Sequence, residues 1–523
     1  MSHPPIVSDL IVVGCGISGL AAAIGAAEEG LSVTVLTKAD EPWQSNTYYA
    51  QGGIVGNGQD DSGDKLAKDI IAAGVGLNWR ESVHLLASEG PDLVDSLLVD
   101  RAGIPFSRNG KGELDLTREA AHSVRRIYHH KDLSGRSIQE GLLAYAAQLE
   151  GRINIYPHMQ ALDIITNNHH STDSQERYRP LRAIGLYVLD ARNNEVMNIY
   201  GSSIILATGG VGGVYQHSSN PSLASGDGIS MAYRAGAAIL NAEFVQFHPT
   251  TLFHRDVKNF LISESLRGEG GLLVNLDGER FMSRYNPDMM ELAPRDEVSR
   301  AIYREMDRTG TACVFLDARQ IDMNLEDRFP GIHEKCASVG IDISREPIPV
   351  VPAAHYFCGG IKVDLEGHTS LPGLLAVGET ACTGVHGANR LASISLLEGL
   401  YFGYRAGKRS ADSGVTPSSR LRKSIPEWIF PVEEDDIDPI LVKNDRNTIR
   451  SLMWNYTGII RNRKRLNRAL SDLNYFSHRI NSFYREARLS RKLIELRNTV
   501  VTASLITRAA KSNDNSIGCH YVE

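Results

Sequence analysis

Residues 9–36 of the chain read DLIVVGCGISGLAAAIGAAEEGLSVTVL, and this stretch decides the fold. A short apolar strand leads into the turn GCGISG, a helical run follows, and a second apolar strand completes the unit. Gly14 allows the tight turn, Gly16 lets the backbone approach a pyrophosphate, and Gly19 lets helix and strand pack closely. The pyrophosphate would lie at the helix N-terminus, where free N–H groups favour an anion. Because a strand precedes the turn and a helix follows it, the stretch predicts dinucleotide binding rather than an ordinary glycine-rich turn.

The acidic residue that usually ends the second strand, where it binds the ribose 2′-hydroxyl, is missing. The strand closes with Thr37 and Lys38, and Asp40 comes too late. Two interpretations are open at this point. Lys38 could meet a 2′-phosphate, which would make the cofactor NADP, or the dinucleotide could be FAD held by other loops.

The composition is that of an ordinary globular protein, with 42% hydrophobic and 22% charged residues. The 523 residues are enough for two or three domains, and the net charge of -7 gives no reason to expect nucleic acid. Its cysteines form no CxxC pair, so neither an iron–sulfur cluster nor a metal site is predicted, and a reducing compartment is expected. The basic cluster Arg461–Arg468 is expected on the solvated face of a helix.

The apolar run from Leu10 to Ala27 could be mistaken for a membrane span or a signal peptide. Glycines and Ser18 interrupt it, however, and the residues before it contain no Lys or Arg. We therefore expect no targeting segment and a cytoplasmic protein.

Two further strand–turn units, Ser203–Ala207 before a Thr-Gly-Gly turn and Leu374–Val377 before a Gly-Glu-Thr turn, lie far apart in the chain. Their separation implies an inserted domain. We expect an α/β fold in which a Rossmann-like dinucleotide-binding domain is discontinuous, with an inserted α+β capping domain and a C-terminal helical bundle. The expected parts are residues 1–245 and 355–420 for the cofactor domain, 246–354 for the capping domain, and 421–523 for a Pro- and acid-rich linker (425–439) and about three helices.

Four side chains that could bind an acidic substrate are expected in loops next to turn glycines. They are His248, Arg295, His355 and Arg390. Each alone is more often structural; Arg295, for example, could be a surface residue at a helix start that Asp296 caps. Together, two arginines and two histidines would suit a dicarboxylate, because arginine binds a carboxylate in bidentate fashion and histidine adds hydrogen bonds.

Nine motifs, in this order and over nearly the whole chain, resemble the succinate dehydrogenase/fumarate reductase flavoprotein family. They are Gly14-x-Gly16-x-x-Gly19, Ser45-Asn46-Thr47 with Ala50-Gln51-Gly52-Gly53-Ile54, Ala207-Thr208-Gly209-Gly210, Ser225-Gly226-Asp227-Gly228, Gln246-Phe247-His248-Pro249-Thr250, Arg267-Gly268-Glu269-Gly270, Pro294-Arg295-Asp296, Gly378-Glu379-Thr380 and His386-Gly387-Ala388-Asn389-Arg390.

The resemblance implies that the cofactor is FAD, which favours the second of the two interpretations above. It also implies which residues contact the cofactor. These are Gly14, Gly16, Ile17, Ser18, Gly19, Lys38, Ser45, Asn46, Thr47, Ala50, Gln51, Gly52, Gly53, Ala207, Thr208, Gly209, Asp227, Glu379, Arg390, Ser395 and Leu396.

Three features resemble the members of the family that oxidise L-aspartate. Asn46 stands where membrane-complex members have the histidine that bonds FAD, which implies a non-covalent cofactor. Glu119 stands in a segment where such members face the substrate's α-ammonium with a carboxylate; burying an ammonium without a partner is costly. Glu119 could otherwise be an ordinary exposed acid. The C-terminal helices also end without the extension typical of multi-subunit members.

The implied reaction is oxidation of L-aspartate to iminoaspartate with hydride transfer to the flavin, the first step of quinolinate and NAD synthesis. Oxygen (giving peroxide) or fumarate (giving succinate) would reoxidise the flavin, and quinolinate synthase is a candidate partner. Arg390, His248 and His355 would hold the carboxylates, Gln246 and Ser263 (usually Thr) would complete the cradle, and Arg295 would donate or accept a proton. The alternative is a fumarate reductase or succinate dehydrogenase flavoprotein subunit.

The chain departs from the expected motif at four places. Ala120 and Ala121 replace two glycines, Ile394 replaces an Asn, and the tail from Asn515 to Tyr521 follows the usual ending only loosely. These departures bear on flavin contacts and turnover rather than on the family.

Overall fold

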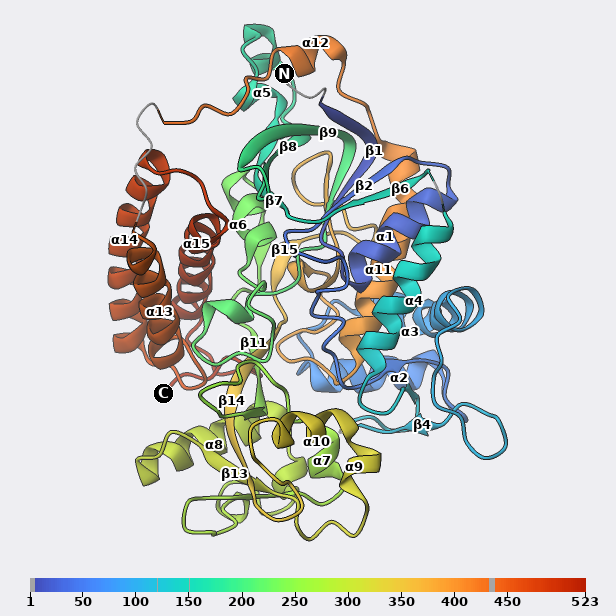
Figure 1. The fold of residues 1–523 in the computed structure, drawn as a ribbon, viewed down its shortest axis with the longest axis vertical. Coiled ribbons are helices and arrows are strands. Elements are labelled where there is room, and N and C mark those ends of the chain that lie inside the picture. The colour runs from blue at the N-terminus through green and yellow to red at the C-terminus, as the bar shows by residue number, and fades with distance from the viewer. Residues whose placement is uncertain (1–4, 120, 150, 432–437) are drawn as a thin grey trace.

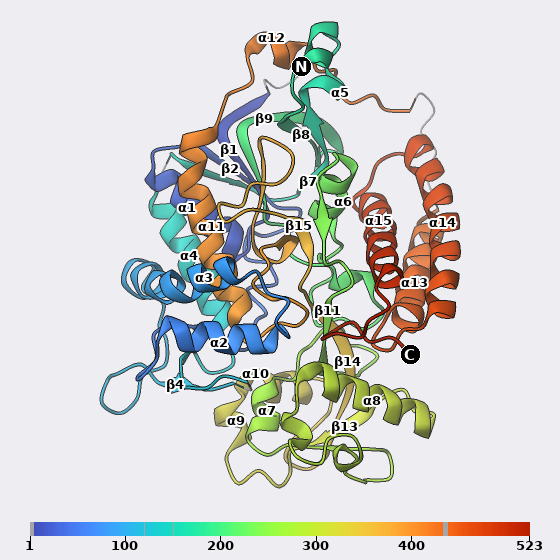
Figure 2. The same cartoon turned by 180° about the vertical axis from the view of Figure 1, so that it is seen from behind.

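A central α/β body carries a smaller lobe at one end and a helical bundle along one side (Figure 1). This computed structural model describes residues 5–119, 121–149, 151–431 and 438–523. Ala120 and residues 432–437 of the expected linker therefore lie outside the described residues. The view from behind shows the same three parts, with the bundle and the lobe meeting near the C-terminus (Figure 2).

The central sheet has the strand order β6-β2-β1-β9-β8-β7, and β16 also pairs with β9. Its strands are β1 (Ile6–Val13), β2 (Val33–Leu36), β6 (Ile153–Tyr156), β7 (Met159–Thr166), β8 (Ala183–Asp190), β9 (Glu195–Leu206) and β16 (Leu374–Ala376). β1 pairs in parallel with both β2 and β9, and β16 joins β9 in parallel from far downstream. The expected discontinuous α/β fold is thus confirmed, because both halves of the chain contribute to one sheet.

Helices α1 (Ile17–Glu28), α4 (Ser134–Gln148) and α11 (Ile394–Ser413) lie together on one side of this sheet (Figure 2). α1 is rich in alanine and almost wholly buried, since the sheet covers one side and α11 the other. Small residues make this close packing possible: a Cβ added at Gly407 would lie 2.0 Å from the carbonyl oxygen of Ala22. The helix that follows the glycine-rich turn is therefore held rigidly against the sheet.

The lobe contains an antiparallel sheet with the order β11-β14-β13-β12 and a core of its own. Its strands are β11 (Val245–Leu252), β12 (Leu272–Val274), β13 (Val314–Asp317) and β14 (Ile348–Phe357), and its helices are α7 (Glu264–Gly268), α8 (Arg295–Thr309), α9 (Leu325–Arg328) and α10 (Pro330–Ala337). β11 and β14 pair with each other, so the chain enters and leaves the lobe along neighbouring strands. Asp132, outside the lobe, accepts hydrogen bonds from the backbone N–H groups of Gly331 and Ile332 at the start of α10.

The C-terminal bundle consists of α13 (Pro439–Tyr456), α14 (Arg463–Glu486) and α15 (Arg491–Ser512), as the sequence predicts. α15 packs against α6 (Asp227–Arg234) of the central body. The prediction that the whole of Arg461–Arg468 is solvated is wrong at its first residue. Arg461 is fully buried, and its guanidinium donates to the carbonyl oxygens of Gly458 and Glu243.

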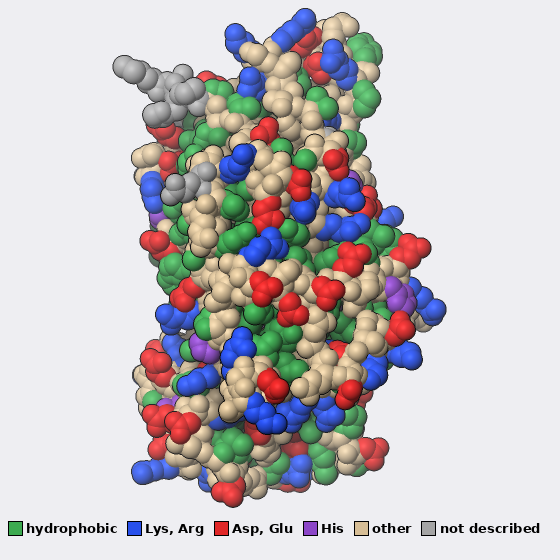
Figure 3. Space-filling view, turned by 90° about the vertical axis from the view of Figure 1, so that its right-hand side faces the viewer, with side chains coloured by type: hydrophobic (Ala, Val, Ile, Leu, Met, Phe, Trp, Pro, Cys, Tyr) green, Lys and Arg blue, Asp and Glu red, His purple; other side chains and the backbone are tan. Residues whose placement is uncertain are grey.

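The remaining elements connect these parts or cover them. They are β3 (Ile54–Val55), β4 (Leu116–Thr117), β5 (Ile127–Tyr128), β10 (Ile239–Leu240), β15 (Gly360–Lys362), β17 (Ala381–Cys382), α2 (Gly63–Ala73), α3 (Arg80–Leu93), α5 (Asn167–His170) and α12 (Ser419–Lys423). Among the helices that the structure describes, none combines the length and the apolar character needed to cross a bilayer. On the face shown in Figure 3, acidic and basic side chains are interspersed, so that face presents no extended basic surface for nucleic acid.

Candidate functional site

A cavity lies where the glycine-rich turn, the lobe and the start of α11 meet. It begins at the carboxyl ends of β1, β2 and β9, the position at which open α/β sheets bind ligands. Every predicted cofactor residue except Gly19 lines it. So do Glu119, His248, Ser263, Arg295, His355 and Arg390, which means that one cavity contains both sets of predicted residues apart from Gly19 and Gln246.

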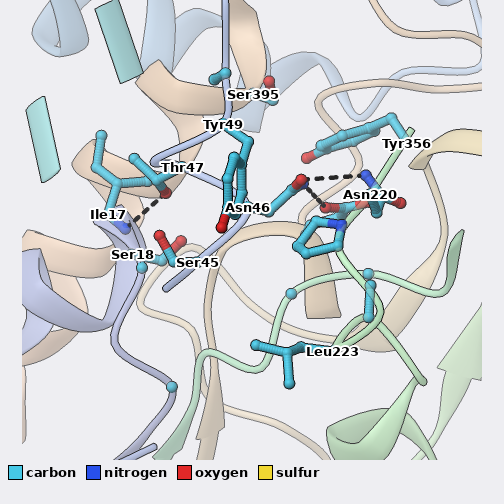
Figure 4. A pocket seen from close by; sticks show the side chains of 18 of the residues that line it. Ile17, Ser18, Ser45, Asn46, Thr47, Tyr49, Asn220, Leu223, Tyr356 and Ser395 are labelled. Atoms are coloured by element: carbon cyan, nitrogen blue, oxygen red, sulfur yellow. Dashed lines mark hydrogen bonds between the residues drawn. The ribbon is translucent and has the colours of Figure 1, made fainter. Parts of the chain in front are cut away.

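The glycine-rich turn fits the backbone approach that a pyrophosphate needs. Gly14 has φ +116°, and a Cβ there would lie 2.1 Å from the carbonyl oxygen of Ala207. Gly19 faces away from the cavity, where a Cβ would lie 2.0 Å from the carbonyl oxygen of Gly14. Gly16 is the N-cap of α1 and has no side chain to cap the helix, so the N–H groups that follow Ile17 are available to an anion. Next to it, the N–H of Ile17 donates to Oγ1 of Thr47 at 3.0 Å (Figure 4).

Lys38 is not free to bind a 2′-phosphate. Its Nζ donates to Asp227 at 2.7 Å, to Glu495 at 2.9 Å and to Ser225 at 2.8 Å, which uses all three of its N–H groups. Burial lowers the pKa of Lys38, but the two carboxylates outweigh burial and raise it, so the ammonium stays charged. The NADP interpretation therefore loses its only support.

Asn46 stands on the cavity wall between two polar partners. Its Oδ1 accepts from Nδ2 of Asn220 at 3.3 Å (Figure 4). Its Nδ2 donates to Oε2 of Glu379 at 3.5 Å. Burial raises the pKa of Glu379 to about 7, although the backbone N–H of Phe357 donates to it. An amide side chain offers no ring nitrogen of the kind that histidine has, and Glu379 can donate or accept a hydrogen bond near neutral pH. Both properties fit a flavin held by hydrogen bonds.

Glu119 faces the cavity and is held from α11. Oγ of Ser393 donates to its Oε2 at 2.7 Å, and the neighbouring His122 hydrogen-bonds the carbonyl oxygen of Ala392 at 3.0 Å. Burial raises the pKa of Glu119, and Arg295 opposes that rise only in part. The alternative of an ordinary solvent-exposed acid does not describe this position.

Arg295 opens α8 and is fixed by an acid that sequence analysis did not identify. Its Nε donates to Oε2 of Glu264 at 2.6 Å, and Nη2 of Arg267 lies 3.6 Å from the same oxygen. Burial raises the pKa of Glu264, but Arg295 and Arg267 outweigh burial and bring it to about 2. Burial lowers the pKa of Arg295, whereas Glu264 and Glu119 raise it further, so both members of the pair are ionised. Asp296 does not cap this helix, since the N-cap residue is Pro294.

His248 and His355 are neutral imidazoles, because burial lowers the pKa of each and the nearby arginines lower it further. Nδ1 of His248 accepts from the backbone N–H of Thr250 at 3.2 Å, which places the ring proton on Nε2. That Nε2 is buried without a hydrogen-bond partner among the described residues. Nδ1 of His355 lies 2.7 Å from Oγ of Ser219, and the two imidazole centroids are 5.1 Å apart.

Arg390 is buried and only partly satisfied. Its Nη1 donates to Ser395 at 2.8 Å and its Nη2 to Oε1 of Gln246 at 3.2 Å, while its Nε has no partner among the described residues. Gln246 also accepts from Nη1 of Arg295 at 3.3 Å. The structure therefore places Gln246 behind the two arginines, which it holds together, rather than on the cavity wall. Ser263 does line the cavity and caps α7 by accepting from the backbone N–H of Ser265.

Comparison with known proteins agrees with this geometry. Residues 9–396 match the family described as FAD binding domain, and residues 446–523 match fumarate reductase flavoprotein C-term. The chain is 41% identical to the L-aspartate oxidase of Yersinia pestis over 98% of its length and 95% of the relative's. It is likewise 41% identical to the L-aspartate oxidase of Halobacterium salinarum, over 98% and 96% of the two chains.

The chain belongs to the L-aspartate oxidase family. Among solved structures, quinol fumarate reductase FrdA of E. coli superimposes with a TM-score of 0.86 at 28% identity, covering 100% of this chain and 92% of that chain. Sdh1 of Mycobacterium smegmatis in complex with UQ1 gives 0.82 at 29% identity, covering 100% and 89%. The fold is therefore shared with the broader flavoprotein family, and the protein is an FAD-dependent oxidoreductase of its L-aspartate oxidase branch.

The departures from the L-aspartate oxidase motif have local consequences in this chain. Ala121 has φ +65°, in the left-handed region where glycine is unstrained. Ile394 is fully buried at the start of α11, within the apolar cluster that includes Leu397 and Leu400. The tail contacts the loop of Arg390, because the N–H of Cys519 donates to the carbonyl oxygen of Ala388 at 3.0 Å.

Sequence analysis missed several residues that shape this L-aspartate oxidase site. Glu264 carried only a weak signal, an acid three positions before Arg267 at helical spacing. Ser393, Asn220 and Tyr356 carried none, since their contacts join segments that are distant in sequence.

Proposed function

We propose that this FAD-dependent enzyme binds L-aspartate in the cavity with its two carboxylates toward Arg390, His248 and His355 and its ammonium toward Glu119, and oxidises it to iminoaspartate. The observation that supports this proposal most directly is the position of Glu119. It is an acid on the wall of a cavity whose other charged groups facing the substrate space include Arg295 and Arg390. A substrate with two carboxylates and one ammonium complements that arrangement, and a plain dicarboxylate leaves Glu119 unpaired.

The cationic side of the cavity contains hydrogen-bond donors that have no acceptor within the described residues. Nε of Arg390 and Nε2 of His248 are buried and have no partner within the described residues. A buried donor that lacks an acceptor costs free energy, so binding of a ligand that accepts from both donors is favoured. Carboxylates are the acceptors that arginine binds best, and a neutral histidine donates one N–H without adding charge.

The residues around the glycine-rich turn fit FAD. Gly14, Gly16 and the start of α1 would hold the pyrophosphate, while Asn46 and Glu379 would hydrogen-bond the cofactor farther along the cavity. When bound, FAD supplies the two-electron acceptor for the oxidation. Asn46 gives no nitrogen nucleophile for a covalent link, which supports a non-covalent cofactor.

Glu119 and Arg295 would divide the proton chemistry between them. The α-ammonium must lose a proton before its lone pair can assist loss of hydride from Cα, and Glu119 is the carboxylate placed to take that proton. Its raised pKa makes it a better base than an ordinary carboxylate. Arg295, kept charged by Glu264, would stabilise the substrate's negative charge. In the reduction of fumarate it would donate a proton to the substrate carbon and be reprotonated through Glu264.

The same cavity accounts for fumarate as an oxidising substrate, because fumarate presents two carboxylates to the same arginines and histidines. Oxygen as an alternative oxidant, quinolinate synthase as the consumer of iminoaspartate and a cytoplasmic location stay predictions from the sequence. The fumarate reductase or succinate dehydrogenase alternative is less favoured, because the resemblance to those chains is 28–29% and their substrates carry no amine for Glu119.

Anaerobic titration of the holoenzyme tests the proposal. Aspartate should bleach the visible flavin absorbance, succinate should bleach it far less, and air should then restore the colour and yield peroxide. Bleaching by succinate and not by aspartate would instead establish the alternative function.

A further inference from the structure

Arg390 is a buried cation without an acidic partner beside it. Among the described residues, no carboxylate lies within ion-pair distance of its guanidinium. The face of the Tyr356 ring lies beneath it instead, with the guanidinium carbon 4.5 Å from the ring centroid. Tyr356 comes from β14 and lines the cavity (Figure 4). The aromatic ring thus provides the negative surface that a buried cation needs.

A buried carboxylate lies at the hydroxyl edge of that ring. The hydroxyl of Tyr356 donates to Oε2 of Glu398 at 2.6 Å, and Nε2 of His386 lies 2.8 Å from the same oxygen. Thr383 donates to the other carboxylate oxygen. Glu398 is only 1% exposed, does not line the cavity and takes no part in the mechanism above. Its charge is therefore built into the site without access to substrate.

A buried arginine that binds substrate needs both a nearby negative charge and free N–H groups, and this arrangement provides both. A carboxylate in direct contact with Arg390 would stabilise the cation but would occupy the N–H groups that the substrate needs. A carboxylate at the hydroxyl end of a tyrosine stays out of contact with the cation, and a phenol that donates to it presents a more electron-rich face. The guanidinium N–H groups that Ser395 and Gln246 do not bind, Nε–H among them, are left for the ligand.

We propose that Tyr356 and Glu398 are positioning residues for substrate binding: the face of the tyrosine ring holds the guanidinium of Arg390, and Glu398, by accepting from the tyrosine hydroxyl, fixes the ring and makes that face more electron-rich. The inference rests on the proposed role of Arg390 in holding a substrate carboxylate. It predicts that both residues set the affinity for dicarboxylates, although only Tyr356 lies on the cavity wall.

The test compares variants of the FAD-loaded enzyme. Tyr356→Leu removes the ring, Tyr356→Phe keeps the ring but removes its link to the acid, and Glu398→Gln keeps the shape but removes the charge. Tyr401→Phe is the matched control, since Tyr401 lies on the same helix as Glu398 and donates to Glu89 outside the cavity. The readouts are the KM and kcat for aspartate, the Kd of succinate from the change it causes in the flavin spectrum, and the melting temperature.

We expect Tyr356→Leu to raise the Kd of succinate and the KM of aspartate by about three- to thirtyfold, the range that a cation–π contact accounts for. Tyr356→Phe and Glu398→Gln should raise both by smaller factors, with kcat at saturating aspartate less affected than KM. Tyr401→Phe should change neither constant. If Glu398→Gln fails to fold, Tyr356→Phe still tests the same link.

Variants that melt at lower temperature but bind succinate as tightly as the wild type would show a purely structural network and overturn the inference. That result would leave the proposed function intact. Conversely, wild-type enzyme whose flavin aspartate does not reduce would refute the proposed function itself.

Discussion

The hydroxyl of Ser393 donates a hydrogen bond of 2.7 Å to the carboxylate of Glu119, although 274 positions separate the two residues. Ser393 lies at the start of α11, three residues after Arg390, and itself has φ +56°. The contact joins the loop that carries the acid to the loop that carries the arginine. The acidic and the basic sides of the cavity are therefore fixed relative to each other before substrate arrives.

Replacing Glu119 with Gln should separate the two reactions of the enzyme. Loss of a charge-assisted hydrogen bond to the ammonium should lower kcat/KM for aspartate by about 10- to 100-fold. Reduction of fumarate, which has no amine, should change far less. Steady-state assays of both reactions measure this, with Glu113→Gln, an exposed acid on the preceding loop, as the control. Equal losses in the two reactions would remove the ammonium role of Glu119.

The raised pKa of Glu119 predicts an acidic limb in the pH profile of aspartate oxidation. The carboxyl must be ionised to pair with the ammonium, so kcat/KM should fall as pH drops through a value above the ordinary range of glutamate. His248 and His355 do not produce this limb, because their lowered pKa values leave both imidazoles neutral over the pH range of the limb. The Glu119→Gln enzyme should lack the limb, and a limb that survives in this variant would assign it to another group.

Replacing Arg295 with Leu should abolish turnover of both aspartate and fumarate. It removes the cation that faces the substrate and leaves Glu264 buried beside Arg267 alone, so the free energy of unfolding should also fall by about 3–5 kcal/mol. Flavin content should stay unchanged, since Arg295 is not among the residues that would hold the cofactor. Flavin absorbance and thermal melting report these effects, and a colourless variant would point to a structural role.

Denaturing the protein should release all of its flavin. Asn46 stands where the family resemblance places a FAD-bonding histidine in membrane-complex members. Its Oδ1 accepts a hydrogen bond from Asn220 instead. Precipitation in acid followed by centrifugation should leave the yellow colour in the supernatant. Colour retained in the protein pellet would contradict a non-covalent cofactor.

Replacing Ala121 with Gly should stabilise the protein. Ala121 has φ +65°, a conformation that costs an alanine about 1 kcal/mol and a glycine little. Because glycine also gains entropy in the unfolded state, the net rise in the free energy of unfolding should be below about 1 kcal/mol. Ala144→Gly, on the exposed side of α4, should instead lower it by about 1 kcal/mol. Calorimetry of the two variants checks the sign, and a loss in both would show that Ala121 is not strained.

Sequence predicted what depends on local spacing. The glycine turn at Gly14 and the strand at Ser203 follow from short-range rules. The loop prediction is correct for Arg390 but wrong for the other three site residues, because His248 lies in β11, His355 in β14 and Arg295 at the start of α8. The partners of those residues could not be predicted, because they are set by tertiary packing: Glu264 beside Arg295, and Glu398 at the hydroxyl of Tyr356. The same reason explains the error at Arg461, which is buried because Glu243 and the C-terminal tail enclose it.

The ammonium of Lys38, a residue of the cofactor cavity wall, binds a carboxylate from α15, so that wall is supported from outside by a helix made late in synthesis. A nascent chain that still lacks α15 would expose Lys38 and Asp227 without Glu495, the partner that α15 supplies. Productive loading of the flavin should therefore follow completion of the bundle rather than accompany translation of the first half of the protein.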